Sequence, residues 1–251
     1  MKSVFLVPNT LLLLLILQTY TTQQSHAQGF VGAATDVPRV SDSRAMDAFR
    51  DLRNRVSRST IPPENIRGSY YFEEDFKPGK VIYFGKELKE KIFLRHNGYT
   101  DEMEIWKGEP GQRNVEEILL KSAEVDCIID GEYYKLLPYR SKSNNVPQIG
   151  YLIVLSDGPK YKLYLQRKKI FMEASEARTS LERSLPARFN DQTNYYFSVG
   201  EETPVPLNKS KRTLVKVFRG EERAVKDYIK TSRNRLKTKE DLTAIFEHFN
   251  N

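Results

Sequence analysis

Residues 94–107, LRHNGYTDEMEIWK, hold an unusual concentration of side chains that could do chemistry. They include a histidine, an asparagine, a tyrosine, three carboxylates and the only tryptophan of the chain. Arg95, His96, Asp101 and Glu104 are the candidate functional residues of this stretch. His96, Asp101 and Glu104 could in principle hold a metal. Zinc, however, usually takes more than one histidine or cysteine, and we therefore predict no metal site.

The same stretch fits a β-hairpin. Ile92 and Leu94 alternate with Phe93 and Arg95 before Asn97-Gly98, which is a turn signal. The extra residues up to Asp101 predict a loop longer than two residues. We expect His96 near the end of the inner face, and the carboxylates on the solvent side and at the turn.

Motifs for established chemistries are missing from the sequence. It contains no glycine-rich phosphate loop, no HExxH, no CxxC and no GxSxG. We assign no catalytic residue and predict no cofactor. Carboxylates cluster at residues 73–75, 101–104 and 116–117, and a hydrolase that uses carboxylates from separate segments stays open as an alternative.

The single cysteine, Cys127, rules out a disulfide within the chain. Val125, Cys127 and Ile129 share one parity of an expected strand, which favours a small buried residue over a catalytic thiol.

The first 27 residues predict a secretory signal peptide. Lys2 precedes the apolar run Leu11–Leu17, and Ser25-His26-Ala27 fits a cleavage site. The apolar run is much shorter than the roughly 20 residues that a membrane span needs. We expect export across the inner membrane, to the periplasm, the outer membrane or the medium, and no transmembrane span after cleavage.

The net charge of +7 is concentrated near the C-terminus, where residues 208–251 contain twelve basic and six acidic residues. A solvated helical face explains this excess. An anion-binding surface is the alternative, and its candidate residues are Lys226, Lys230, Arg233, Arg235 and Lys237. No aromatic-interleaved basic platform accompanies them, and we expect no nucleic-acid partner.

Apolar periodicity divides the rest of the chain. We predict a flexible leader at 28–40, an amphipathic helix at 41–58, an antiparallel β domain at 66–207 and a basic helical segment at 208–251 that packs on it. Within the β domain, residues 68–76 and the hairpin at 150–168 predict strands, whereas 173–185 predicts a loosely helical connection. In the hairpin, Leu163 and Leu165 alternate with Lys162 and Gln166, which predicts one inward face and one face in solvent. The fold class is mainly β or α+β, an antiparallel meander that forms a partial barrel or a sandwich.

The chain also resembles an uncharacterised family of exported proteins common in Bacteroidota. The resemblance rests on Gly68-Ser69, on Leu94-Arg95 with Asn97, on Tyr99, on Asp101 to Glu104, and on a C-terminal helix from Asp241 to Asn250. His96 stands where the family tends to have tyrosine, which argues against an essential metal ligand there. The resemblance implies export and a shared fold, and no activity.

These observations together predict an exported, non-enzymatic β-rich protein of the cell envelope. It would act as a structural, adaptor or ligand-binding module, with an envelope protein or a surface ligand as its partner.

Overall fold

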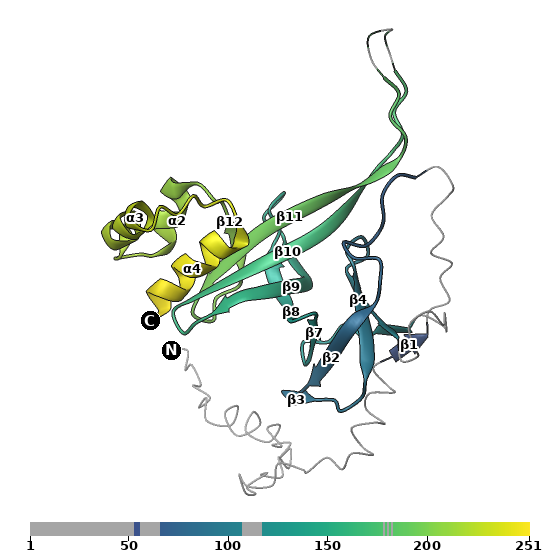
Figure 1. Cartoon of the computed structure of the whole chain (residues 1–251), viewed down its shortest axis with the longest axis horizontal. Coiled ribbons are helices and arrows are strands. Elements are labelled where there is room, and N and C mark those ends of the chain that lie inside the picture. The colour runs from purple at the N-terminus through teal and green to yellow at the C-terminus, as the bar shows by residue number, and fades with distance from the viewer. Residues whose placement is uncertain (1–52, 56–65, 107–116, 178, 180, 182) are drawn as a thin grey trace, which may run out of the picture. The chain divides into compact units, whose positions relative to one another are not determined.

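The computed structural model describes residues 53–55, 66–106, 117–177, 179, 181 and 183–251. β-strands account for more of these residues than helices do (Figure 1). The strands are β1 (Arg53–Arg55), β2 (Lys77–Tyr83), β3 (Lys86–Glu87), β4 (Ile92–Asn97), β5 (Glu102–Trp106), β6 (Glu117–Leu119), β7 (Val125–Ile129), β8 (Glu132–Arg140), β9 (Pro147–Asp157), β10 (Tyr161–Met172), β11 (Arg188–Val199) and β12 (Val205–Leu207).

All strands of the described ranges join one open antiparallel sheet. Its order is β1-β6-β5-β4-β2-β7-β8-β9-β10-β11-β12, with β3 attached to β2. Many neighbouring strands also follow each other along the chain, because short turns connect them. Asp130 and Gly131 form one such turn between β7 and β8 and both have positive φ, as a two-residue type I′ hairpin requires. The predicted mainly-β antiparallel fold is confirmed.

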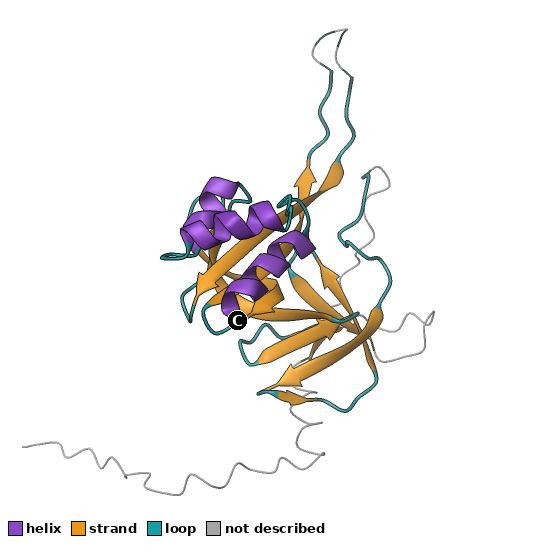
Figure 2. Cartoon of the chain, turned by 60° about the vertical axis from the view of Figure 1, so that its left-hand side comes forward, coloured by secondary structure: helices purple, strands orange, loops and turns teal. Residues whose placement is uncertain are grey.

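Three helices follow the strands: α2 (Lys211–Val217), α3 (Glu222–Thr231) and α4 (Lys239–Asn250). Thr238 begins α4 with a capping box, in which its side chain accepts from the Asp241 N–H and the Asp241 carboxylate accepts from the Thr238 N–H. Figure 2 shows the helices gathered against the strands. Leu242, Ile245, Phe246 and Phe249 of α4 are buried, as their spacing predicts.

Two apolar clusters lie along one face of the sheet. The first lies between the strands themselves and includes Leu94, Ile105, Cys127 and Leu165. The second lies between the sheet and the helices, where Leu163 packs with α2, α3 and α4. The charged cleft described below opens where the strand-covered part of this face gives way to the helix-covered part.

The opposite face is also partly covered, which the alternation in residues 150–168 did not predict. Tyr139, Leu152, Tyr164 and Tyr196 form a third buried cluster there. Gln166, expected to face solvent, is only 2% exposed. Its Oε1 accepts from the Tyr196 hydroxyl at 3.3 Å, and such a partner lowers the cost of burying an amide.

Three predicted elements differ from the structure. Of the expected helix at 41–58, only residues 53–55 are described, and they form strand β1 paired with β6. Residues 68–76 form bends and one bridge at Tyr71, and the strand starts at Lys77. Residues 173–185 are not helical where described: Ser175 and Leu185 exchange two backbone hydrogen bonds and continue the β10–β11 hairpin.

In the part of the chain that the structure describes, no helix is long and apolar enough to cross a membrane.

Candidate functional site

The turn between β4 and β5 organises the region that the sequence singled out. Four residues, 98–101, connect the strands, which confirms a loop longer than two residues. The Asn97 side-chain oxygen accepts from the backbone N–H groups of Tyr99 and Thr100, both at 3.1 Å. Asp101 has a φ of 56°, a conformation that aspartate tolerates better than most residues. The turn therefore has a fixed shape.

This turn is held between β9 and β10. The β9–β10 ladder stops at the pair Ile153–Leu165, while β10 continues beside β11. Beyond that point the Lys169 N–H donates to the Gly98 carbonyl at 2.8 Å, and the Tyr151 N–H donates to Asp101 Oδ2 at 3.1 Å. The turn therefore accepts backbone hydrogen bonds from β9 and β10 at positions where these two strands no longer pair with each other.

Glycine is needed at the centre of this contact. A Cβ at position 98 would lie 3.1 Å from both Lys169 Cγ and Phe72 Cε2, which is tighter than ordinary van der Waals contact. Backbones that approach closely favour glycine for this reason.

A buried ion pair supports the hairpin below the turn. Arg95 Nε and Nη2 donate to Glu104 Oε2 at 2.9 and 2.6 Å. The Tyr71 hydroxyl donates to Glu104 Oε1 at 2.9 Å, and the Arg95 guanidinium lies 3.8 Å from the Tyr71 ring centre. Glu104 is 3% exposed, so its predicted solvent position is wrong: residues 68–76, expected as a strand, instead supply Tyr71 to cover this face.

His96 lies on the other face of the hairpin, as predicted. Its Nε2 is 3.0 Å from Asp101 Oδ1, and its ring packs against the rings of Tyr134 and Tyr151. Asp101 therefore connects His96 to the backbone of β9. Such a carboxylate–imidazole pair fixes the ring orientation.

The structure does not assemble the metal set considered above. His96 pairs with Met103 and Arg95 pairs with Glu104 across the hairpin, which puts Glu104 on the face opposite His96. Among the described residues, no group of three or more histidine, cysteine or acidic side chains could hold a metal ion.

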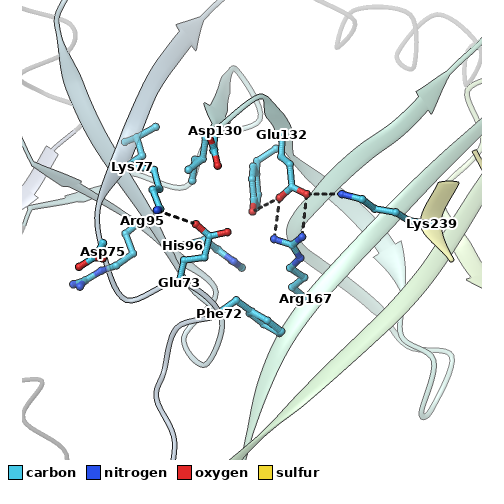
Figure 3. A pocket seen from close by; sticks show the side chains of 13 residues that line it. Phe72, Glu73, Asp75, Lys77, Arg95, His96, Asp130, Glu132, Arg167 and Lys239 are labelled. Carbon is cyan, nitrogen blue, oxygen red and sulfur yellow. Dashed lines mark hydrogen bonds and ion pairs between the residues drawn. The ribbon is translucent and has the colours of Figure 1, made fainter.

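A cleft of about 270 Å³ opens beside His96, and we refer to it as the charged cleft (Figure 3). Its walls come from β4, from residues 72–77, from the β7–β8 turn, from β10 and from α4. It is lined by Phe72, Glu73, Asp75, Lys77, Leu94, Arg95, His96, Ile129, Asp130, Glu132, Tyr134, Arg167 and Lys239.

Glu132 is the centre of one wall. Arg167 binds it with two hydrogen bonds of 2.9 Å, one to each oxygen, and Lys239 Nζ adds a third at 3.1 Å. The Tyr134 hydroxyl donates to Oε2 at 3.3 Å. Burial and then the Glu132 charge raise the pKa of Tyr134, so its hydroxyl remains a donor. This network positions two cations at the edge of the cleft.

The remaining carboxylates have looser surroundings. Glu73 lies 4.0 Å from Lys77, at the limit of an ion pair. Asp75 and Asp130 have no side-chain hydrogen bond or ion pair with the described residues. In Figure 3 the Asp130 and Glu73 side chains lie across from Arg167. The cleft can therefore offer both acceptors and donors to a bound molecule.

Only part of this site follows from the sequence. Arg95 and His96 line the charged cleft, Asp101 lines a second groove, and Glu104 is buried beneath the hairpin. Glu132, Arg167 and Lys239 were missed because 35 and 107 residues separate Glu132 from its partners. One signal was present: Arg167 shares the parity of Leu163 and Leu165 and so occupies an inward position.

The other candidates lie elsewhere. Cys127 is fully buried, and burial raises the pKa of its thiol, so it lacks the exposed thiolate of a nucleophile. Each of the five basic residues proposed to contact anions is exposed, two on α3 and three between α3 and α4, and none lines the charged cleft. They are Lys226, Lys230, Arg233, Arg235 and Lys237.

Comparison of the chain with protein-family models, with curated proteins and with solved structures returned no match.

Proposed function

We propose that the protein is an exported, non-enzymatic binding module that takes a small neutral saccharide in the charged cleft. The observation that carries the proposal is the composition of the cleft wall. It contains the cations of Lys77, Arg167 and Lys239, the carboxylates of Glu73, Asp75, Asp130 and Glu132, and the rings of Phe72 and Tyr134. Arg95 also lines the cleft, but its guanidinium is paired with Glu104 on the other face of the hairpin.

A balanced wall selects against net charge. An anion attracted by Arg167 and Lys239 would also meet Asp130 and Glu73, and its Coulomb energy would largely cancel. A sugar carries many hydroxyl groups, each of which both donates and accepts. Carboxylates such as Asp130 can accept from these hydroxyls, while Lys77, Arg167 and Lys239 can donate to them.

The size and the aromatic rings agree with such a ligand. Small-molecule pockets usually have volumes on the order of 300–1,000 Å³, and this cleft lies at the lower end, which suits one or two sugar rings. The apolar face of a sugar can pack on an aromatic ring such as Phe72, while its hydroxyls reach the charged rim.

The ion pairing of Glu132 favours binding over catalysis. Both oxygens of Glu132 accept hydrogen bonds from Arg167 or Lys239, so this carboxylate orients the two cations and does not face a bound molecule directly. One observation favours the alternative, a carboxylate-dependent hydrolase: Glu73, Asp75 and Asp130 reach the same cleft from two separate segments.

The test is a calorimetric titration of the full-length chain with neutral oligosaccharides built from glucose, galactose or N-acetylglucosamine. The sample is then assayed for released reducing ends. We expect binding without release. Release would establish the hydrolase instead, and absence of binding to every saccharide would contradict the proposal.

Asp130→Asn is the diagnostic variant, because asparagine keeps the hydrogen-bonding shape and also favours the type I′ turn with Gly131. Loss of a charged acceptor should weaken binding by about tenfold or more. Asp227→Asn, on the exposed face of α3, is the matched control and should bind like the unmodified chain.

We further propose export through residues 1–27 and membership of the exported Bacteroidota family that the sequence resembles. Residues shared with that family make supporting contacts: Asn250, for example, accepts from the Tyr161 N–H at 2.9 Å and donates to the Tyr161 carbonyl at 2.8 Å. Expression with the intact N-terminus followed by mass spectrometry should find a mature chain that starts at Gln28. An unprocessed chain that stays inside the cell would contradict export.

A further inference from the structure

A second groove, of about 720 Å³, lies on the other side of the β4–β5 turn. We call it the lysine groove. It is lined by Gly98, Tyr99, Thr100, Asp101, Lys121, Tyr139, Gln148, Ile149, Lys168, Lys169, Ile170 and Phe171. It occupies the space between β9 and β10 beyond the point where their ladder stops. In Figure 1 the β10–β11 hairpin continues past the end of β9.

Backbone groups on both walls of this groove lack strand partners. The Tyr151 N–H points away from β8, because it donates to Asp101. Backbone direction alternates along a strand, so the N–H and C=O of Ile149 point the same way. The partner of Ile149 on β8 is Pro138, which has no N–H to give. Pro138 and Ile149 are therefore a pair that exchanges no backbone hydrogen bond within the β8–β9 ladder.

Backbone groups of β10 also point into the groove. The Lys169 N–H points toward β9, because it donates to the Gly98 carbonyl. Two residues further on, the N–H and C=O of Phe171 must point the same way. Neither Ile149 nor Phe171 has another backbone hydrogen bond on this side with the described residues. Unpaired strand edges of this kind bind an added strand.

Side chains around the groove define what such a strand would carry. Ile149 is 69% exposed and shares one face with Phe171, whereas Gln148 and Lys168 lie on the other face. The Lys168 ammonium donates to the Tyr139 hydroxyl at 3.0 Å, and it has no carboxylate partner among the residues that the structure describes. By contrast, Lys169 has a carboxylate partner, Asp191, at 2.6 Å.

We propose that the lysine groove binds an extended peptide segment with alternating acidic and apolar residues, as an added strand between β9 and β10. The apolar side chains would contact Ile149 and Phe171, and the acidic side chains would face Lys168. Charge complementarity and period-two alternation together select this partner over an anionic polysaccharide, which has no amide groups to pair with the strand edges.

The test measures fluorescence anisotropy of a labelled hexapeptide of alternating aspartate and valine with the full-length chain. A second peptide has the same sequence with alternate amides N-methylated. N-methylation should weaken binding about tenfold or more, since each lost backbone hydrogen bond costs on the order of 1 kcal/mol. Equal binding of the two peptides, or no binding of either, would overturn the proposal.

Variants and a competitor give the second arm. Lys168→Gln should weaken binding of the aspartate peptide about threefold or more. Lys160→Gln, at the β9–β10 turn, should leave binding of this peptide unchanged. A lysine–valine peptide should bind more weakly than the aspartate peptide. If a heparin fragment binds while neither peptide does, the groove recognises anionic charge alone and the strand-addition proposal is wrong.

Discussion

The charged cleft and the lysine groove lie on opposite sides of the β4–β5 turn and are built by different means. Side chains build the charged cleft: Arg167 and Lys239 come from β10 and α4 and are fixed by Glu132. Strand divergence builds the lysine groove, where the backbone groups of Ile149 and Phe171 have no partner among the described residues. One turn bounds both, since His96 lines the first, Asp101 lines the second, and the two are 3.0 Å apart. Position in the fold thus decides whether side chains or the backbone can recognise a ligand.

The largest expected effect comes from loosening α4, which contributes to the charged cleft and not to the lysine groove. Phe246 is fully buried against Phe218, and Phe246→Ala should lower the free energy of unfolding by about 3–5 kcal/mol. Because α4 also carries Lys239, saccharide binding should weaken more than peptide binding. Urea denaturation is the measurement, with exposed Glu247→Ala as the control on the same helix. A loss below about 0.5 kcal/mol would mean that α4 does not dock as described.

Breaking the Arg95–Glu104 ion pair, which supports the β4–β5 hairpin, should affect both the charged cleft and the lysine groove. Arg95→Ala leaves Glu104 buried without its cation, and we expect a loss of about 3–5 kcal/mol in the free energy of unfolding. The double variant Arg95→Leu with Glu104→Met should recover most of that loss, because it also removes the stranded carboxylate. If the single variant is as stable as the unmodified chain, the ion pair does not hold the hairpin.

A smaller change should act on the lysine groove selectively. A Cβ at position 150 would lie 2.5 Å from Asp101 Oδ2 and 3.2 Å from Tyr139 Cε1. Gly150→Ala should therefore displace Asp101 from the Tyr151 N–H and cost about 1–3 kcal/mol. Peptide binding should fall more than saccharide binding, because Asp101 lines the lysine groove itself and reaches the charged cleft only through His96. Exposed Ile149→Ala should leave the urea midpoint unchanged, and an equal midpoint for Gly150→Ala would contradict the contact.

The mildest expected effect concerns alkaline pH and the face opposite the helices. Burial, reinforced by Tyr139, raises the pKa of Tyr196 from 10.0 to about 12. The folded state thus favours the neutral phenol, and this contribution to stability is complete below pH 10 and declines as the pH rises toward 12. Urea midpoints across this range should fall less steeply for Tyr196→Phe. Parallel slopes for the two proteins would show that Tyr196 ionises equally in both states.

How far the sequence predicts this molecule depends on the range of the interactions. Thr238, Asp241 and the stripe from Leu242 to Phe249 predict α4 correctly, because capping and periodicity are local. Glu104 was misplaced because a second layer, supplied by Tyr71, covers the face that alternation assigns to solvent. Residues 173–185 lack strong alternation, yet Ser175 and Leu185 continue the hairpin, because β10 before them pairs with β11 after them.

The candidate site shows the same limit. Local pattern identified Arg95, His96 and Asp101 as a group, because they lie within one hairpin. The Glu132 network joins β8, β10 and α4, and its members become neighbours only when the sheet and the helix layer pack together. The inward parity of Arg167 was the one local sign of it.

The most direct test of the central claim is an amide NMR titration of the isotope-labelled full-length chain with the neutral saccharide that binds best. We expect shift changes to concentrate at Lys77, Asp130, Gly131 and Lys239, around the charged cleft, and to spare Ile149 and Phe171. Changes confined to the lysine groove, or spread evenly over the surface without saturation, would contradict it.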